Sequence, residues 1–199
     1  MPIAYFGGAF NPPHIGHLVI AERVREARKL ERVDLLVSGQ PPHADGKTSI
    51  DAKHRIAMAK LAVAANAGLG VDDREARRPG KSYTIDTARE LIAQGNKRPA
   101  FIIGGDMLAD LPTWREVGDL LKIADFIPVL RPGFGWDEID TLRAAFGDKQ
   151  AKALMDNCVK CPLLQISSTE IRDRLRANQS VRYLVPEAVI EYAQANKLY

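Results

Sequence analysis

The chain has 199 residues, of which 46% are hydrophobic and 27% are charged, with a formal net charge of +3, as is typical of one folded domain and not of a disordered chain. It shows no hydrophobic run of the ~18 residues that a membrane-spanning helix needs, no secretion signal and no dense block of Lys and Arg. With only two cysteines, it is predicted to be cytoplasmic, without membrane or nucleic-acid partners.

Short hydrophobic runs alternate along the chain with segments of helical periodicity. In chain order we expect a strand at 3–6, a helix at 16–27, strand 33–37, helix 51–65, strand 68–73, helix 82–93, strand 100–103, helix 116–124, strand 126–130, helix 137–155 with room for a break at Gly147, strand 163–166, helix 168–177 and helix 186–196. This alternation predicts an α/β fold: a Rossmann-like, doubly wound parallel sheet with helices on both faces, as a single domain over 1–199.

Four unusual stretches follow predicted strands. They are GGAFNPPHIGH at 7–17, SGQPPH at 38–43, GGD at 104–106 and ISSTEIR at 166–172. Ligands of open parallel sheets bind beyond the carboxyl ends of the strands, so the four stretches are expected to meet at one site.

The first stretch has the composition of an anion site. Gly7 and Gly8 let the backbone approach a ligand, and a helix that begins near residue 16 presents free N–H groups. His14 and His17 lie one helical turn apart and can add imidazole N–H donors on the same side. The alternative is that both histidines only cap a turn.

The last stretch, ISSTEIR, predicts a helix start. Ser167, Ser168 and Thr169 are ordinary N-cap residues, and Arg172 follows about one turn later. Arg172 either lies on a solvated face or reaches an anion bound at the same helix N-terminus. Two helix N-termini facing one cleft would form a polyphosphate site.

The two cysteines, Cys158 and Cys161, form a C-V-K-C pair. A zinc site would need His43 or His54 from far upstream, because no second pair follows. Two small side chains beside a loop are the better interpretation, and no protein metal site is predicted.

The motifs together resemble a known family. GGAFNPPHIGH is similar to the histidine motif of the nucleotidyltransferases, and ISSTEIR to their second phosphate motif. PPH at 41–43, SYTIDT at 82–87, FIIGGDMLADLPTW at 101–114 and VLRPG at 129–133 narrow the resemblance to the bacterial nicotinate mononucleotide adenylyltransferases, over nearly the whole chain.

The resemblance implies transfer of the adenylyl group of ATP to nicotinate mononucleotide, giving nicotinate adenine dinucleotide and pyrophosphate in NAD biosynthesis. It implies catalytic roles for His14, His17 and Arg172, with His17 at the α-phosphate, and Mg²⁺ bound through the ATP phosphates. The helices from about residue 168 would complete the phosphate site. The implied ATP-binding residues are Gly7, Gly8, Phe10, His14, His17, Gly104, Arg131, Ser167, Ser168, Thr169 and Arg172.

The resemblance also implies a pyridine subsite, in which Trp114 stacks on the ring unless it is simply a core residue. Thr84 and the backbone near Arg115 would meet the carboxylate, and Asp106 would bind ribose hydroxyls. The implied substrate-binding residues are His43, Tyr83, Thr84, Asp106, Trp114 and Arg115. Two positions depart from the family pattern. Ala9 replaces a Ser or Thr, and the basic residue that often follows His43 directly is absent; whether Lys47 takes its place is left open by the sequence.

Alternatives remain open at this point. Nicotinamide mononucleotide or phosphopantetheine could be the acceptor, although Trp114 and the SYT segment argue against phosphopantetheine, which has no ring to stack. A non-catalytic nucleotide sensor is a further alternative, against which the intact set of His14, His17 and Arg172 argues. Oligomer formation is compatible with the sequence.

Overall fold

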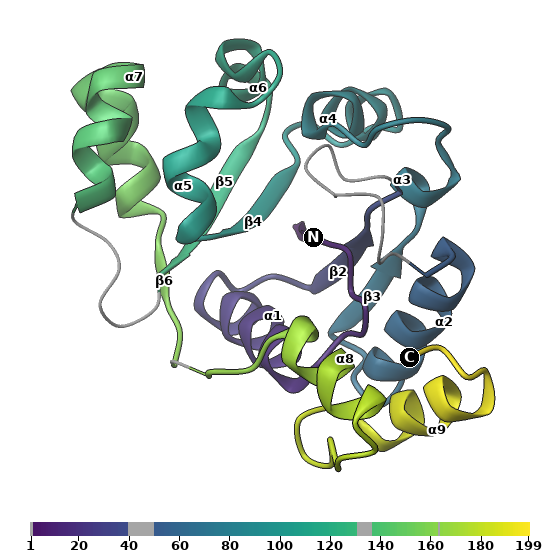
Figure 1. Cartoon of the computed structure of the whole chain (residues 1–199). Coiled ribbons are helices and arrows are strands. Elements are labelled where there is room, and N and C mark those ends of the chain that lie inside the picture. Colours follow the sequence, from purple (N-terminus) through teal and green to yellow (C-terminus); the bar gives the residue numbers. More distant parts are fainter. Residues whose placement is uncertain (1, 40–49, 131–136, 163) are drawn as a thin grey trace.

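The computed structural model describes residues 2–39, 50–130, 137–162 and 164–199 (Figure 1). The strands are β1 (Ile3–Gly8), β2 (Arg32–Val37), β3 (Leu69–Asp72), β4 (Ala100–Gly104), β5 (Asp125–Leu130) and β6 (Val159–Lys160). The helices are α1 (Ile15–Ala27), α2 (Ala52–Val63), α3 (Arg74–Arg77), α4 (Thr84–Ala93), α5 (Asp106–Asp110), η1 (Leu111–Thr113), α6 (Val117–Ile123), α7 (Asp137–Asp156), α8 (Ser168–Arg176) and α9 (Glu187–Ala195).

The strands pair in the order β3-β2-β1-β4-β5-β6, and every pair is parallel. The chain builds outward from β1 in one direction, then returns to β4 and builds in the other. The order of a doubly wound sheet therefore reverses between β1 and β4, where such sheets bind their ligands. The predicted fold class is confirmed.

Each strand sends alternate side chains to opposite faces of the sheet, and each face carries its own core. Ala4 and Phe6 of β1 pack with Ala21 and Val24 of α1, in a cluster that also includes residues of α2. Tyr5 of the same strand lies in the other cluster, with residues of α4, α5, α6 and α7. Helices cover both faces, as the sequence predicts.

A third, smaller cluster lies outside the sheet. Met58 of α2 packs there with Ile171 of α8 and with Val189 and Ile190 of α9. Figure 1 shows α8 beside the start of α1, and α9 beside α2. The C-terminal helices are thereby anchored to the half of the sheet that carries β1 and β2.

The strand predicted at 163–166 is wrong. The edge strand β6 is Val159–Lys160, which pairs with Val129 and Leu130, and residues 164–166 form no strand. Cys161 still donates its N–H to Leu130 O, but Pro162 has no N–H to continue the ladder. Ile166 packs instead against the third cluster.

Other differences are local. The short helices α3 and α5 and the turn η1 were not predicted, because helices of three to five residues leave little periodicity in the sequence. The break in α7 is confirmed at Gly147, whose φ of 79° only glycine adopts readily.

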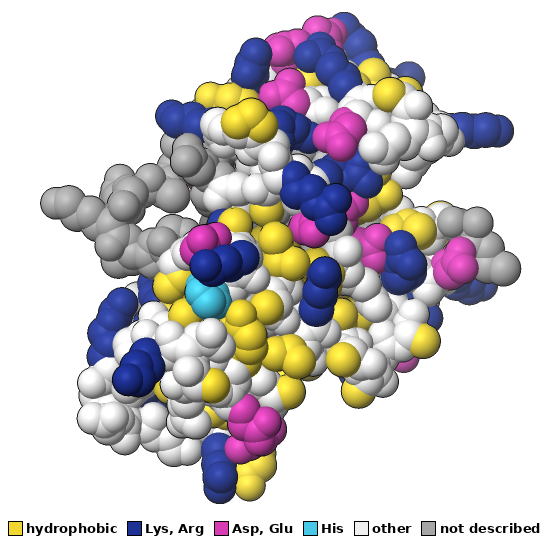
Figure 2. Space-filling view, turned by 90° about the vertical axis from the view of Figure 1, so that its right-hand side faces the viewer, with side chains coloured by type: hydrophobic (Ala, Val, Ile, Leu, Met, Phe, Trp, Pro, Cys, Tyr) yellow, Lys and Arg dark blue, Asp and Glu magenta, His cyan; other side chains and the backbone are white. Residues whose placement is uncertain are grey.

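One face of the molecule is drawn in Figure 2. Lys and Arg side chains are scattered over it among Asp and Glu, and hydrophobic side chains gather near its middle. Among the described residues, no helix is both long and apolar enough to span a membrane.

Candidate nucleotide-binding site

The candidate site lies at the reversal of strand order, where β1 and β4 end in the glycine pairs Gly7-Gly8 and Gly104-Gly105. The last register pair of these strands, Phe6 and Ile102, stands just before both pairs. Gly105 is held by its N–H, which donates to Val129 O on β5. The two glycine pairs therefore follow neighbouring strands at the same edge of the sheet.

Behind β1 the chain makes a tight turn over its own end. Phe10 has a left-handed backbone with φ 49°, and its ring is 2% exposed. A Cβ at Gly8 would lie 2.9 Å from Cζ of that ring. Gly8 is required so that Phe10 can fold back, which gives this glycine a packing role.

The two histidines lie against each other at the start of α1. Their rings stack with centroids 3.7 Å apart and an interplanar angle of 27°, and His17 meets Phe10 edge-on at 5.1 Å. His14 is the N-cap residue and is buried, while His17 is half-buried. Sequence spacing predicts one shared side, and the structure places both rings there.

The orientation of His17 is set by the main chain. The N–H of His14 donates to His17 Nδ1 at 3.1 Å. An imidazole nitrogen that accepts carries no proton, so the neutral ring holds its proton on Nε2. His17 is therefore oriented as an Nε2–H donor.

The structure gives a steric reason for the glycine between the two histidines, Gly16. A Cβ there would lie 3.0 Å from both Cε1 and Nδ1 of the His14 ring. Any side chain at position 16 would push this ring, and with it the stacked ring of His17.

We expect Gly16→Ala to uncouple stability from activity. Alanine is favoured over glycine in a helix by up to ~1 kcal/mol, so the midpoint of thermal unfolding should stay the same or rise. The displaced His14 ring should nevertheless lower kcat/KM about three- to tenfold. Thermal melts measure the first effect, and an assay of the adenylyl transfer implied by the resemblance measures the second. Unchanged kcat/KM would contradict the steric role of Gly16.

Helix α8 is tied to the same loop. Ser168 Oγ donates to Pro12 O at 2.9 Å, and Arg172 Nη1 donates to Asn11 O at 2.9 Å. These partners are 156 and 161 residues apart in sequence. The N-termini of α1 and α8 therefore meet across the loop at 11–12, as predicted from the motifs.

The side chains of this junction already have protein partners. Ser167 Oγ caps α8 by accepting from Glu170 N, and Thr169 Oγ1 accepts from Arg172 Nη2 at 3.1 Å. Arg172 Nε is buried and has no acceptor in the described part of the chain. At α1, the N–H of Ile15 is used by Leu184 O. An anion here would meet the backbone N–H groups of α8 and the Arg172 side chain.

A second group of predicted residues lies where α4 begins. Tyr83 is its N-cap residue and Thr84 its first residue. The Arg115 guanidinium lies over the Tyr83 ring at 4.8 Å from the centroid, and Arg115 also pairs with Asp86 at 3.8 Å. Arg115 follows Trp114 directly, so the four predicted residues Tyr83, Thr84, Trp114 and Arg115 share one region.

Trp114 is packed as a core residue on one side. Its ring is half-buried and meets Phe126 edge-on at 5.9 Å, within the core cluster under α4 to α7. Trp114 therefore lies at the boundary of the core, and the rest of its surface is exposed to solvent.

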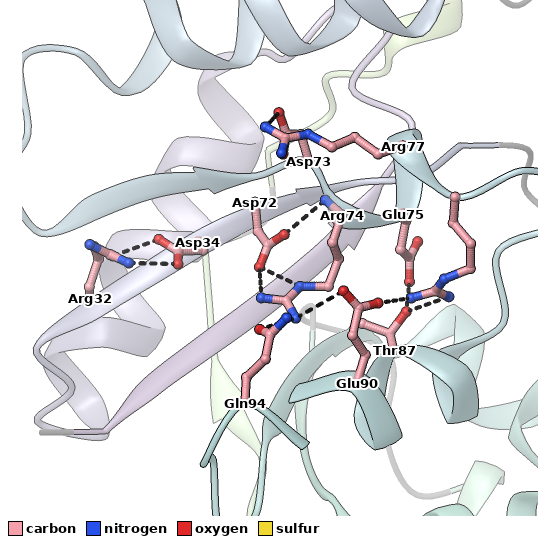
Figure 3. Close-up of polar contacts among 11 residues, drawn as sticks. Arg32, Asp34, Asp72, Asp73, Arg74, Glu75, Arg77, Thr87, Glu90 and Gln94 are labelled. Atoms are coloured by element: carbon pink, nitrogen blue, oxygen red, sulfur yellow. Dashed lines mark hydrogen bonds and ion pairs between the residues drawn. The ribbon is translucent and has the colours of Figure 1, made fainter. Parts of the chain in front are cut away.

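The middle and the C-terminal end of α4 are held by an ion-pair network that sequence reasoning missed (Figure 3). Arg74 of α3 bonds to Asp72 at 2.8 Å and to Gln94 at 2.9 Å, and it pairs with Glu90. Beside it, Thr87 donates to buried Glu75 at 2.7 Å, and burial raises the pKa of that carboxyl. The network fastens α4 to the edge of the sheet.

Three predicted residues receive no side-chain description. His43 and Arg131 lie outside the described residues, and Asp106 is described only as the first residue of α5.

The cysteines behave as packing residues. Both are free thiols, Cys161 belongs to the core, and burial raises the pKa of Cys158 to about 11. Thiols with raised pKa values are poor nucleophiles and poor metal ligands. Among the described residues, no three or more His, Cys, Asp or Glu side chains are grouped to hold a metal.

Two residues that contact the loops of the site were not identified from the sequence. Arg55 of α2 is 2% exposed and bonds to the loops after β1 and β2, and Tyr199 donates its hydroxyl to Asn11 Oδ1 at 2.7 Å. The available signal for Arg55 was its spacing, since it lies three residues before Met58 on the buried face of the helix. Nothing in the sequence pointed from Tyr199 to residue 11.

Comparison with known proteins agrees with this geometry. A family model described as cytidylyltransferase-like matches residues 5–174. The probable nicotinate-nucleotide adenylyltransferase of a Roseiflexus species is 41% identical over 198 residues, covering 100% of this chain and 98% of the relative. The corresponding Oceanobacillus iheyensis protein is 38% identical, covering 99% and 96%. Plasmodium falciparum nicotinic acid mononucleotide adenylyltransferase, solved in complex with NaAD, shares the fold, with a TM-score of 0.76, 18% identity and coverage of 100% and 97%.

Proposed function

Because the chain belongs to the cytidylyltransferase-like family and, within it, to the nicotinate-nucleotide adenylyltransferases, we propose that it transfers the adenylyl group of ATP to nicotinate mononucleotide. The products are nicotinate adenine dinucleotide and pyrophosphate, a step of NAD biosynthesis. The observation that carries the proposal is the junction of two helix N-termini at the loop at 11–12, with the stacked histidines and Arg172 beside it.

The reaction joins two anions. An oxygen of the mononucleotide 5′-phosphate attacks the α-phosphorus of ATP, and the bond from that phosphorus to the β-phosphate oxygen breaks. The nucleophile is already ionised, so no general base and no covalent enzyme intermediate are needed. The protein has to align the two phosphates and stabilise the charge that builds up between them.

His17 is proposed to serve the α-phosphate. The main-chain bond to Nδ1 leaves Nε2–H as the donor. Stacking on His14 and the edge contact with Phe10 hold the ring in one orientation, so little reorganisation is needed when charge develops. His14 supports that ring and is a second candidate phosphate donor.

Helix α8 and Arg172 are proposed to hold the β- and γ-phosphates as they leave. The N–H groups of the first turn of α8, at Ser168 and Thr169, face the junction with the loop at 11–12. Arg172 can exchange its bond to Asn11 O for a phosphate oxygen, because an ionised acceptor makes the stronger bond. Gly7, Gly8, Phe10, Gly104, Ser167 and Arg131 complete the proposed ATP site.

Mg²⁺ is proposed to enter with ATP, bound by phosphate oxygens and water, where it would neutralise part of the triphosphate charge. The junction fits an ATP molecule that carries Mg²⁺. Its N–H donors and the Arg172 guanidinium would bind the phosphate oxygens that the ion does not coordinate. No protein ligand is assigned.

Trp114, Tyr83, Thr84 and Arg115 are proposed to form the pyridine subsite, with His43 and Asp106 as further contacts. The first turn of α4 offers N–H groups to a carboxylate, and the partial positive charge of the helix N-terminus favours an anion there. The open face of Trp114 suits a flat ring.

A pyrophosphate-release assay tests the function directly. ATP is supplied with nicotinate mononucleotide, nicotinamide mononucleotide or phosphopantetheine, each in turn. Turnover with the nicotinate compound above the other two is the expected result. Turnover with none of them, despite tight ATP binding, would indicate a nucleotide sensor. Cytoplasmic location, and the lack of nucleic-acid and membrane partners, stay predictions of the sequence.

We expect preference for the acid over the amide, because the two mononucleotides differ only in a carboxylate and a carboxamide. Backbone N–H donors around Thr84 and Arg115 suit both carboxylate oxygens, whereas a carboxamide NH₂ would face a donor. An unpaired buried donor costs ~1–3 kcal/mol, or roughly ten- to hundredfold in kcat/KM.

The matched variant is Trp114→Ala. Stacking does not distinguish two flat rings of similar size, so this change should weaken both substrates by similar factors and keep their ratio. Measuring kcat/KM for both mononucleotides in the wild-type protein and in Trp114→Ala checks both the preference for the acid and the unchanged ratio. A wild-type protein that favours the amide would overturn the assigned acceptor and leave adenylyl transfer standing.

A further inference from the structure

The largest fully buried side chain of the described protein is a cation. Arg55 of α2 is 2% exposed. A buried charge is tolerated only where its N–H groups find acceptors. Burial lowers the pKa of Arg55, and electrostatic attraction to Asp51 and Tyr199 acts in the opposite direction. The guanidinium nevertheless stays protonated under any ordinary condition.

Its hydrogen bonds in the described part of the chain all go to main-chain oxygens. Nη1 donates to Ala9 O at 3.0 Å and to Ser38 O at 2.6 Å, and Nη2 donates to Gly39 O at 3.0 Å. Nε lies 3.4 Å from Ile50 O. Ala9 directly follows β1, and Ser38 and Gly39 directly follow β2. One planar fork thus holds the carboxyl ends of two adjacent strands.

One branch of this contact leads to the proposed ATP site. Ala9 immediately precedes Phe10 and the loop at 11–14, which carries the bonds to Ser168 and Arg172. Ser38 N–H donates to Gly8 O, which joins the ends of β1 and β2 a second time.

The other branch leads to the proposed pyridine subsite. Gly39 N–H donates to Ser82 Oγ at 3.0 Å, and Ser82 directly precedes Tyr83 and Thr84. The approach is close enough that a Cβ at Gly39 would lie 2.5 Å from Glu75 O. The carbonyl and the N–H of one residue, Gly39, therefore link Arg55 to the segment that begins α4.

We propose that Arg55 is a positioning residue for adenylyl transfer, which keeps the two nucleotide subsites in register through the main chain at 9 and 38–39. This role presupposes the function proposed above. Arg55 touches neither substrate; it sets the distance between the loop that presents ATP and the segment that presents the acceptor. In-line attack is sensitive to that distance, so the effect falls on turnover more than on binding.

The test compares Arg55→Met, Arg55→Lys and, as a control, Val63→Ala in the full chain. Val63 is a buried residue of the same helix whose loss weakens the core without touching either loop. Hydrogen exchange is measured without substrate, and kcat and both KM values are measured by pyrophosphate release. All assays are run where circular dichroism shows the variants folded.

Arg55→Met should speed amide exchange at Ser38 and Gly39, where the control does not. It should lower kcat about tenfold and leave each KM within about threefold of the wild-type value. Arg55→Lys should restore only part of the lost kcat, because one ammonium does not span three carbonyls. Should Arg55→Met not fold, Arg55→Lys carries the same test.

A folded Arg55 variant with wild-type kcat, a fall no larger than that of Val63→Ala, or full recovery with Lys would each overturn the positioning role. So would a change confined to KM. A wild-type protein without pyrophosphate release would contradict the proposed function instead, and the exchange result would still decide whether Arg55 holds the two loops.

Discussion

Replacing His17 with alanine is expected to lower kcat about a hundredfold or more, while the protein stays folded. The ring is fixed by the N–H of His14, by stacking on His14 and by Phe10, so its Nε2–H needs no reorganisation to meet developing charge. Removing one such preorganised donor typically costs 10²–10³ in kcat, or ~2.7–4 kcal/mol. Because the donor is used mainly in the transition state, the KM for ATP should change little.

The matched control is His54→Ala. His54 is also a helix histidine with a hydrogen-bond partner, Tyr192 at 3.0 Å, but it lies on α2 outside the proposed site. It should keep normal kcat. Steady-state pyrophosphate release and thermal melts of both variants give the comparison, and near-normal turnover of folded His17→Ala would remove His17 from the catalytic role.

Replacing Arg172 with alanine is expected to lower kcat/KM for ATP by up to about a hundredfold. Hydrogen bonds to charged groups contribute ~1.5–3 kcal/mol, and this side chain also ties α8 to Asn11 O. The KM for ATP should rise and kcat should fall, because the β- and γ-phosphates are held in both the ground state and the transition state. The affinity for the mononucleotide, measured by calorimetry, should stay nearly unchanged.

Arg172→Lys should restore only part of this loss. Arg172 uses two nitrogens at once, one toward Asn11 O and one toward Thr169 Oγ1, and a lysine ammonium does not reproduce that fork. Arg176→Ala is the control on the same helix, since Arg176 is exposed and pairs only with Asp173 in the described residues. Full recovery by lysine would show that a point charge suffices, and a fall in mononucleotide affinity would place Arg172 elsewhere.

Residues that are close together in the sequence could be assigned to a site from their spacing. His14, Gly16 and His17 share one helical turn, which is enough to predict that both rings lie on one side. The ISST segment predicted a helix start for the same reason, because an N-cap depends on residues three apart. Local periodicity also predicted the α/β alternation, and a parallel sheet follows from that alternation.

The edge of the sheet was not decided locally. The hydrophobic residues at 163–166 have the composition of a strand, but a strand needs a partner with free backbone groups. The partner, the end of β5, is already used by Val159 and Lys160, and Pro162 ends the ladder. Pairing with β5 therefore decided that residues 159–160, and not the hydrophobic segment that follows, form the edge strand.

Burial likewise belonged to the tertiary structure. An arginine in α2 is expected to be solvated, yet Arg55 is enclosed because the ends of β1 and β2 present three carbonyl oxygens to it. Those carbonyls come together only when the strands pair. The chemical groups of each segment, and the helix or strand that most segments form, could be predicted from the sequence, since both depend on neighbours a few residues apart. Which segments meet, such as Ser168 with Pro12 and Tyr199 with Asn11, depended on the folding of the whole chain, because contacts across more than 150 residues leave no local pattern.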